Sequence, residues 1–356
     1  MHFIKQSLQF LLDVNHQLFN NCHASTLVVL PDSDELLVAY FAGQKEASGD
    51  TAIWLSRCVK GEWLPAQRAI AQDGLAHWNP VLHYQCGTLW LFYKVGPDVH
   101  HWITRYVTSG DGGQSWNQPQ ELMEGDLLPR GPVKNKLLVM SNGEWLAPSS
   151  IENDRYWDAF VDISADLGER WQRVDIPIAH INPASADERD IWQGLKDDAL
   201  WETDLQRVFQ WDGVIQPTVW ESAPGQVHAM MRSTRGRIYR SDSKDYGRSW
   251  CPAYETELPN NNSGIDVVAL KNGGLVLACN PIEGNWNRRY PISISVSQDN
   301  GKTWSIPLDL ESGEGEFSYP AIIADGETLH VTYTWNRKNI VYQKITSDND
   351  NNGVPS

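Results

Sequence analysis

Basic, amide and imidazole side chains recur where strand-like segments begin or end, and their types could bind an anion or move a proton. Two arginines, Arg232 and Arg289, can hold a carboxylate through charge-assisted hydrogen bonds. His23 is either a buried, hydrogen-bonded side chain or a general base near neutral pH. Further polar residues at such points are Asn79, Arg130, Lys134, Asn262 and Asp266. These residues predict either a binding site or a hydrated channel.

A repeated octad marks the elements that must position these residues. The pattern Ser-x-Asp-x-Gly-x-x-Trp occurs at 109–116, 164–171, 243–250 and 297–304. A fifth copy at 56–63 keeps the Ser and the Trp but has Cys58 in place of Asp. The Asp can accept backbone N–H groups, the Gly permits a positive φ, and the Trp packs over the turn. Each octad therefore predicts a tight turn between two strands.

The octads divide the chain into repeats of about 54 residues, with an insertion in the third interval. Within a repeat, alternating apolar residues predict three strands before the octad and one after it, as at 23–30, 35–41 and 51–57. The first strands of the repeats begin near His23, Asn79, Val133, Gln216, Ser263 and Tyr319. We therefore expect an all-β, six-bladed propeller, closed by the N-terminal segment so that no sheet edge stays open.

The repeats also predict the domain organisation. Residues 1–346 are expected to form a single propeller domain, and residues 347–356 a disordered polar tail. The insertion, at about 178–207, is polar and contains a short helical pattern. We expect it on one face of the ring, where it helps to wall a site.

Composition narrows the classes of partner. The chain has 356 residues, 17 Trp and a net charge of −16, which argues against binding to nucleic acid or to a membrane surface. Its five Cys form no CxxC pair, and no metal-binding or nucleotide-binding motif is present, so no cofactor or metal is expected. Neither a membrane helix nor a signal peptide is recognised, which predicts a cytoplasmic protein.

The octads resemble the Asp-boxes of the sialidase superfamily, and the resemblance covers essentially the whole chain. It implies a site at the ring centre, where three arginines hold a sugar carboxylate. A Tyr nucleophile activated by a Glu, and an Asp acid/base, complete that site. The boxes themselves mark the fold and not the activity.

Three positions of this chain match the implied site. Tyr319, in EFSYPAII, corresponds to the nucleophile. Arg289 lies eight residues before a box Ser and corresponds to the third arginine, with Arg288 as the alternative register. Arg232, in HAMMRS, corresponds to the second arginine.

The remaining positions are less direct. Asp50 corresponds to the acid/base, with Glu46 as a competitor. The first arginine is replaced by His23, and the activating glutamate by Gln216. Because Gln cannot take a proton from Tyr319, these departures place the chain in a divergent branch.

The resemblance and its departures leave three possible functions. The first is an exo-glycosidase that releases a terminal carboxylate-bearing sugar, of sialic or uronic type, from an anionic oligosaccharide. The second is a uronate-directed lyase in which a His–Tyr pair removes a proton. The third is a non-catalytic sugar-binding propeller. Trp residues outside the octads either pack in the core or form a sugar-stacking platform; they include Trp78, Trp157, Trp192 and Trp286.

Overall fold

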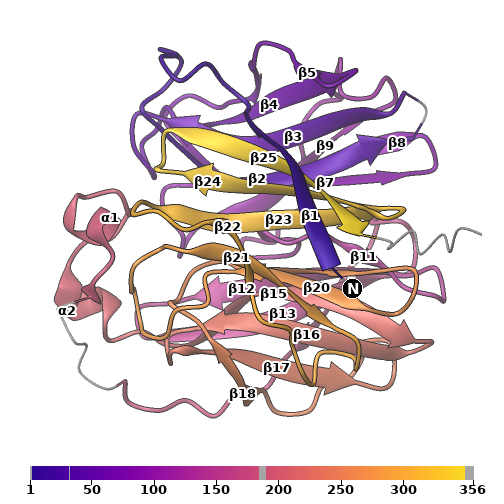
Figure 1. The fold of residues 1–356 in the computed structure, drawn as a ribbon, viewed down its shortest axis with the longest axis vertical. Helices are drawn as coiled ribbons and strands as arrows, with labels where there is room; N and C mark the ends of the chain where they lie inside the picture. The colour runs from indigo at the N-terminus through magenta and orange to yellow at the C-terminus, as the bar shows by residue number, and fades with distance from the viewer. Residues whose placement is uncertain (1, 32, 184–189, 349–356) are drawn as a thin grey trace, which may run out of the picture.

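The computed structural model describes residues 2–31, 33–183 and 190–348, and all statements about the structure refer to these residues. The expected polar tail at 347–356 lies largely outside them. The fold is an all-β, propeller-like arrangement in which sheets are stacked side by side around a common centre (Figure 1). No helix of this part of the chain is long and apolar enough to cross a membrane.

Five sheets contain the strands, and nearly all strand pairs are antiparallel. The first sheet contains β2 (Asn21–Leu30), β3 (Glu35–Gly43), β4 (Ala52–Val59), β5 (Glu62–Trp63) and β6 (Gln67–Ile70). The second contains β7 (Ala76–Gln85), β8 (Thr88–Gly96), β9 (Ile103–Ser109) and β10 (Gln120–Glu121).

The third sheet has eight strands. They are β11 (Leu138–Val139), β12 (Trp145–Glu152), β13 (Tyr156–Ser164), β14 (Gln172–Asp175), β15 (Asp212–Ala223), β16 (Gln226–Ser233), β17 (Arg237–Ser243) and β18 (Tyr254–Pro259). The fourth contains β19 (Asp266–Ala269), β20 (Leu275–Cys279), β21 (Ile292–Ser297) and β22 (Leu308–Glu311). The fifth contains β23 (Phe317–Asp325), β24 (Thr328–Trp335), β25 (Asn339–Asp348) and the N-terminal strand β1 (His2–Phe10), which pairs with β25.

Six separate sheets were expected, and the hydrogen bonding gives five. The difference arises where β13 and β15 form a short parallel pair, Tyr156 with Asp212 and Trp157 with Gly213. A Cβ atom at Gly213 would lie 2.0 Å from the carbonyl oxygen of Trp157, so only glycine allows this approach.

The four full octads form the expected turns. In each, the Ser hydroxyl donates to the Asp carboxylate and accepts the N–H of the box Gly; for Ser109 these distances are both 2.7 Å. Trp171, Trp250 and Trp304 each donate the indole N–H to the carbonyl of their box Gly. These side-chain hydrogen bonds fix the turns between the third and fourth strands of the repeats.

The fifth octad takes another form. There β4 and β5 make a tight hairpin, with Cys58 opposite Trp63 and a two-residue turn of Lys60 (φ 52°) and Gly61 (φ 86°). Two positive φ values are the signature of the turn that matches the twist of paired strands.

Most of the core lies between neighbouring sheets rather than within one. One apolar cluster joins the first and second sheets, and others join the fourth to the fifth and the fifth to the first. The insertion forms a separate cluster with α1 (Gln193–Lys196) and α2 (Leu205–Val208). Both helices project from one side of the molecule (Figure 1).

Candidate functional site

Six residues with positive φ mark the inner ends of the repeats and direct side chains toward the centre. The strand register shifts beside four of them, which is typical of a β-bulge. Non-glycine residues adopt this conformation at a cost of roughly 1–2 kcal/mol each. Such strain is concentrated at functional sites. The six are Ala24 (55°), Asn79 (43°), Lys134 (61°), Gln216 (54°), Asn262 (58°) and Tyr319 (54°).

Three of these residues, Asn79, Gln216 and Tyr319, line a small inner cavity of about 30 Å³. Its volume suits one or two water molecules rather than a sugar ring. Leu200, Trp201 and Trp211, from the insertion and the residues just after it, cover the cavity. Of the residues expected in the site, the walls contain His23, Glu46, Asn79, Gln216, Arg232 and Tyr319.

Arg232 lines this cavity, and only 1% of its surface is exposed. Its Nε and Nη2 donate to the side chain of Asn262, at 3.0 and 2.9 Å, and Nη2 also donates to the Asn262 carbonyl. Its Nη1 donates to Gln216 Oε1 at 3.2 Å and to the phenolic oxygen of Tyr319. All these partners are neutral, and no Asp or Glu of the described residues forms an ion pair with it. Arg232 is therefore a buried cation without a counter-ion.

His23 packs against the nucleophile candidate. Its ring centroid lies 4.1 Å from that of Tyr319, and its Nδ1 is 2.8 Å from Thr334 Oγ1. Nε2 is buried and has no partner. Burial, aided by the charges of Arg337 and Arg289, holds the pKa of His23 well below its usual range. The ring is therefore neutral and has one free nitrogen.

Glu152, a residue that the sequence patterns did not single out, also lines the inner cavity. It ends β12. Burial raises the pKa of Glu152 to about 7, although the charge of Arg232 opposes this shift. A carboxyl group that keeps its proton near neutral pH can act as a general acid.

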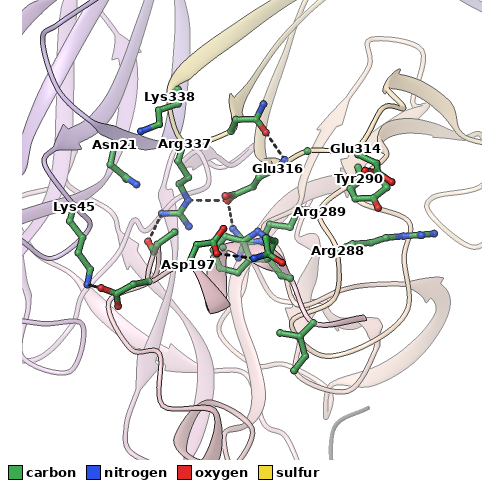
Figure 2. Close-up of a pocket in the computed structure, with 18 of the residues that line it drawn as sticks. Asn21, Lys45, Asp197, Arg288, Arg289, Tyr290, Glu314, Glu316, Arg337 and Lys338 are labelled. Atoms are coloured by element: carbon green, nitrogen blue, oxygen red, sulfur yellow. Dashed lines mark hydrogen bonds and ion pairs between the residues drawn. The ribbon is translucent and has the colours of Figure 1, made fainter. Parts of the chain in front are cut away.

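A larger pocket of about 950 Å³ lies beside the inner cavity (Figure 2). Arg289 lines it, donates from Nη1 to Glu316 at 2.9 Å, and carries its guanidinium carbon 3.7 Å above the ring centroid of Trp192. Burial lowers the pKa of Arg289 to about 10, so it stays charged near neutral pH. Its guanidinium carbon is 5.7 Å from the ring centroid of Tyr319, which brings the large pocket close to the inner cavity.

Arg337 was also missed from the sequence, and it joins the two spaces. Its Nε donates to Glu316 at 2.9 Å and its Nη1 to Glu46 at 2.6 Å. Figure 2 shows Arg337, Glu316 and Arg289 as one connected chain of ion pairs. Comparison of the repeats could have found it, because Arg337 follows the second strand of its repeat (β24), and Arg232 lies near the end of the corresponding strand β16.

The two candidates for the acid/base residue have different surroundings. Glu46 is 9% exposed and lines the cavity. Asp50 is exposed and accepts the N–H of Gln44 at 2.9 Å, together with the hydroxyl of Ser48. Asp50 therefore fixes its own loop, and the structure brings Glu46, not Asp50, to the other site residues.

Two basic candidates make contacts that hold strands together. Arg130 pairs with Asp162 at 2.8 Å and does not line the inner cavity or the large pocket. Lys134 Nζ donates to the carbonyls of Ile265 and Pro320, on two other repeats, and burial lowers the pKa of Lys134 to about 7.

The last three candidates, Asp266, Asn262 and Arg288, also have different surroundings. Asp266 pairs with Lys136 at 2.7 Å and accepts the N–H of Ile322, so it also joins strands. Asn262 orients Arg232. Arg288 is exposed and lines the large pocket, so the alternative register of the arginine stays outside the cavity.

The four Trp residues outside the octads that the sequence singled out lie at the site. Trp78, Trp157 and Trp286 line the inner cavity, and Trp192 lines the large pocket. No group of three His, Cys, Asp or Glu side chains in the described ranges is placed to hold a metal ion.

Comparison with known proteins identifies the family of this chain. The sequence model of the BNR repeat-like domain matches residues 34–331. A sialidase of Bacteroides fragilis is 23% identical over 275 residues, which cover 72% of this chain and 44% of the sialidase. The chain therefore spans less than half the length of this relative.

Solved structures share the fold at low sequence identity. A Hadza microbial sialidase is 19% identical with a TM-score of 0.71, over 95% of this chain and 68% of that one. A Dyadobacter fermentans protein of unknown function is 15% identical with a TM-score of 0.70, over 97% of this chain and 99% of that one. Since the family match covers most of the sequence, the chain belongs to the BNR repeat-like domain family.

Proposed function

We propose that this protein is a sialidase-like carbohydrate enzyme that releases a terminal carboxylate-bearing sugar from an oligosaccharide. The observation that carries the proposal is the buried guanidinium of Arg232, which has no acidic partner and donates to the phenolic oxygen of Tyr319. A buried cation favours an anionic ligand and stabilises negative charge that develops on that oxygen. The sialidase relatives support the reaction class.

In this reaction the Tyr319 oxygen attacks the anomeric carbon, and the bond to the leaving-group oxygen breaks. The bound carboxylate of the substrate offsets the cations that lower the pKa of His23, so that His23 can receive the phenolic proton, which Gln216 cannot. Glu152, whose pKa is raised to about 7, donates a proton to the leaving group. Water then attacks the anomeric carbon and gives a proton to the Glu152 carboxylate, the sugar–tyrosine bond breaks, and His23 returns its proton to the Tyr319 oxygen.

Substrate access involves both spaces. A ring-sized ligand fits the pocket of about 950 Å³ but not the inner cavity of about 30 Å³. We propose that the oligosaccharide enters through the large pocket and that Trp201 moves to admit the terminal sugar. Arg289, between the two spaces, meets the carboxylate.

The proposal includes a six-bladed ring within a single domain, in which the eight-stranded sheet represents two blades. The six inner residues with positive φ support this count. The pairing of β1 with β25 supports closure by the N-terminal segment. Cytoplasmic localisation stays a prediction.

The test is a screen of purified protein against sialosides and uronate-containing oligosaccharides, read by release of the free sugar. Tyr319→Phe and Arg289→Ala should each lower turnover by at least about 100-fold, because each removes a group that touches the substrate. Tyr254→Phe, a surface tyrosine 43% exposed, is the control. Wild-type turnover in Tyr319→Phe would exclude the nucleophile.

One observation favours a lyase as the second candidate. The neutral His23 has a free, buried Nε2 beside Tyr319, which suits abstraction of a proton next to a uronate carboxylate. A lyase forms an unsaturated product that absorbs ultraviolet light, and a hydrolase does not. Saturable binding without either product would indicate a sugar-binding propeller.

A further inference from the structure

Three buried indole N–H groups in the inner cavity have no hydrogen-bond partner. They belong to Trp78, Trp157 and Trp286, which are 1%, 1% and 3% exposed. An indole N–H can only donate, so each needs an acceptor atom. A buried donor left unpaired costs about 1–3 kcal/mol.

These unpaired donors are confined to one place. Within the described residues, all three buried indoles that lack a partner line the inner cavity. Two buried indoles outside the cavity are paired: Trp220 donates to Asn300 at 2.8 Å, and Trp250 to Gly247 at 2.9 Å. The free Nε2 of His23 faces the same group of residues. Among the described residues, the buried indole N–H groups that lack a partner therefore all belong to residues that line this cavity.

The same rings surround the buried cation. The guanidinium carbon of Arg232 lies 5.6 Å from the ring centroid of Trp157 and 5.8 Å from that of Trp286. The planes of these two indoles are 80° apart, so their N–H edges do not run parallel. Donors that approach from different directions suit a ligand with several acceptor oxygens, not a single atom.

We infer that Trp78, Trp157 and Trp286 form a donor set that binds the oxygens of a sugar acid and so determines which terminal sugar is accepted. The inference rests on the proposed function and extends it, because it assigns recognition to indole N–H groups in addition to arginines. The ligand class is a sugar acid rich in hydroxyl, carboxylate or acyl oxygens.

The first experiment follows the indole N–H signals by nuclear magnetic resonance while N-acetylneuraminic acid or glucuronic acid is added. Single Trp→Phe variants at the three positions assign the signals. We expect the signals of Trp78, Trp157 and Trp286 to move on addition of one of these acids, while that of Trp220 stays in place. If neither acid moves them, the cavity holds water only, and the inference is wrong.

The second experiment measures Kd and KM for the acid and its glycoside in Trp157→Phe and Trp286→Phe. Each variant keeps an aromatic ring and loses one donor, so binding should weaken about tenfold, with kcat less affected. Trp220→Phe is the matched control and should keep the wild-type Kd. If a variant does not fold, the inference is tested on the wild-type protein alone, by comparing its indole N–H signals with and without the acid.

The outcomes separate the two proposals. Kd and KM that are unchanged in Trp157→Phe and Trp286→Phe overturn the donor set and leave the proposed enzyme intact. Movement of the three signals without any turnover supports the donor set and contradicts the proposed enzyme.

Discussion

Arg232 and Glu152 line the same cavity, and near neutral pH the arginine is fully charged whereas the glutamate is only partly ionised. Arg232 is a buried cation whose partners are neutral. The pKa of Glu152 is raised to about 7, chiefly by burial, so near neutral pH a large share of it is protonated. Glu46, the other acid of the cavity, is paired with Arg337, so Arg232 is left without an ion-pair partner and an anion beside it is favoured.

The raised pKa of Glu152 predicts a pH-dependent stability. The usual value for this side chain is 4.5, and the folded carboxyl keeps its proton up to about pH 7. Between these values the folded state binds more protons than the unfolded state, so the free energy of unfolding falls as pH rises. From pH 5 to pH 8 this group should account for a loss of about 2 kcal/mol.

Glu152→Gln removes that proton and should flatten the pH profile by the same amount. Urea unfolding of wild type and variant at pH 5, 6, 7 and 8 measures it. Glu124→Gln, at an exposed site, is the control and should follow the wild-type profile. Identical profiles for Glu152→Gln and wild type would show that the carboxyl is not perturbed.

Residue types and repeat positions predicted part of the site. The structure brings Tyr319, Arg232, His23 and Gln216 together because each lies at the inner end of a repeat, a position that can be read from the sequence. The choice between Asp50 and Glu46 could not be read in this way. It depends on Arg337, 291 residues from Glu46 along the chain, whose ion pair exists only after folding.

At the scale of elements, the octad turns were predictable from the sequence, and the junction between β13 and β15 was not. The octads specify their own hydrogen bonds locally, so their pattern sufficed. The parallel pairing of β13 with β15 depends on a close approach at Gly213, which follows a long insertion. The cover formed by Leu200 and Trp201 also depends on long-range packing, and the sequence indicated only that the insertion walls one face.

The β4–β5 hairpin offers a prediction at this scale. Lys60 adopts a φ of 52°, which is unfavourable for Lys and easily adopted by Asn. Lys60→Asn should therefore raise the free energy of unfolding by about 0.5–1 kcal/mol. Thermal and urea unfolding check it. Lys271→Asn, in an exposed turn outside the positive-φ set, should have a smaller effect; equal effects would exclude the backbone explanation.

At the scale of the molecule, Trp content and net charge have separate causes. Five of the 17 Trp belong to the octads, and several others line the inner cavity and the large pocket. The charge of −16 is compatible with a basic interior, because Arg232, Arg289 and Arg337 are all buried. The global charge therefore argues against extended anionic partners and still permits a small anionic ligand.

The pairing of β1 with β25 leads to a prediction about the stability of the whole molecule. β1 pairs with β25 along most of its length, and Phe3 and Phe10 pack against the cluster between the fourth and fifth sheets. Deletion of residues 2–10 removes these contacts and leaves the edge of β25 unpaired. The free energy of unfolding should fall by on the order of 3 kcal/mol.

The exposed edge should also cause self-association, since an unpaired strand can pair with another chain. Size-exclusion chromatography and thermal unfolding of the truncated protein measure both effects. The control replaces Ile4 and Leu8, which are 46% and 45% exposed, with Ser. This variant keeps the backbone pairing and should stay monodisperse if the wild type is. A truncated protein as stable as the wild type would mean that β1 is an appendage, and that the fifth sheet is complete with β23, β24 and β25 alone.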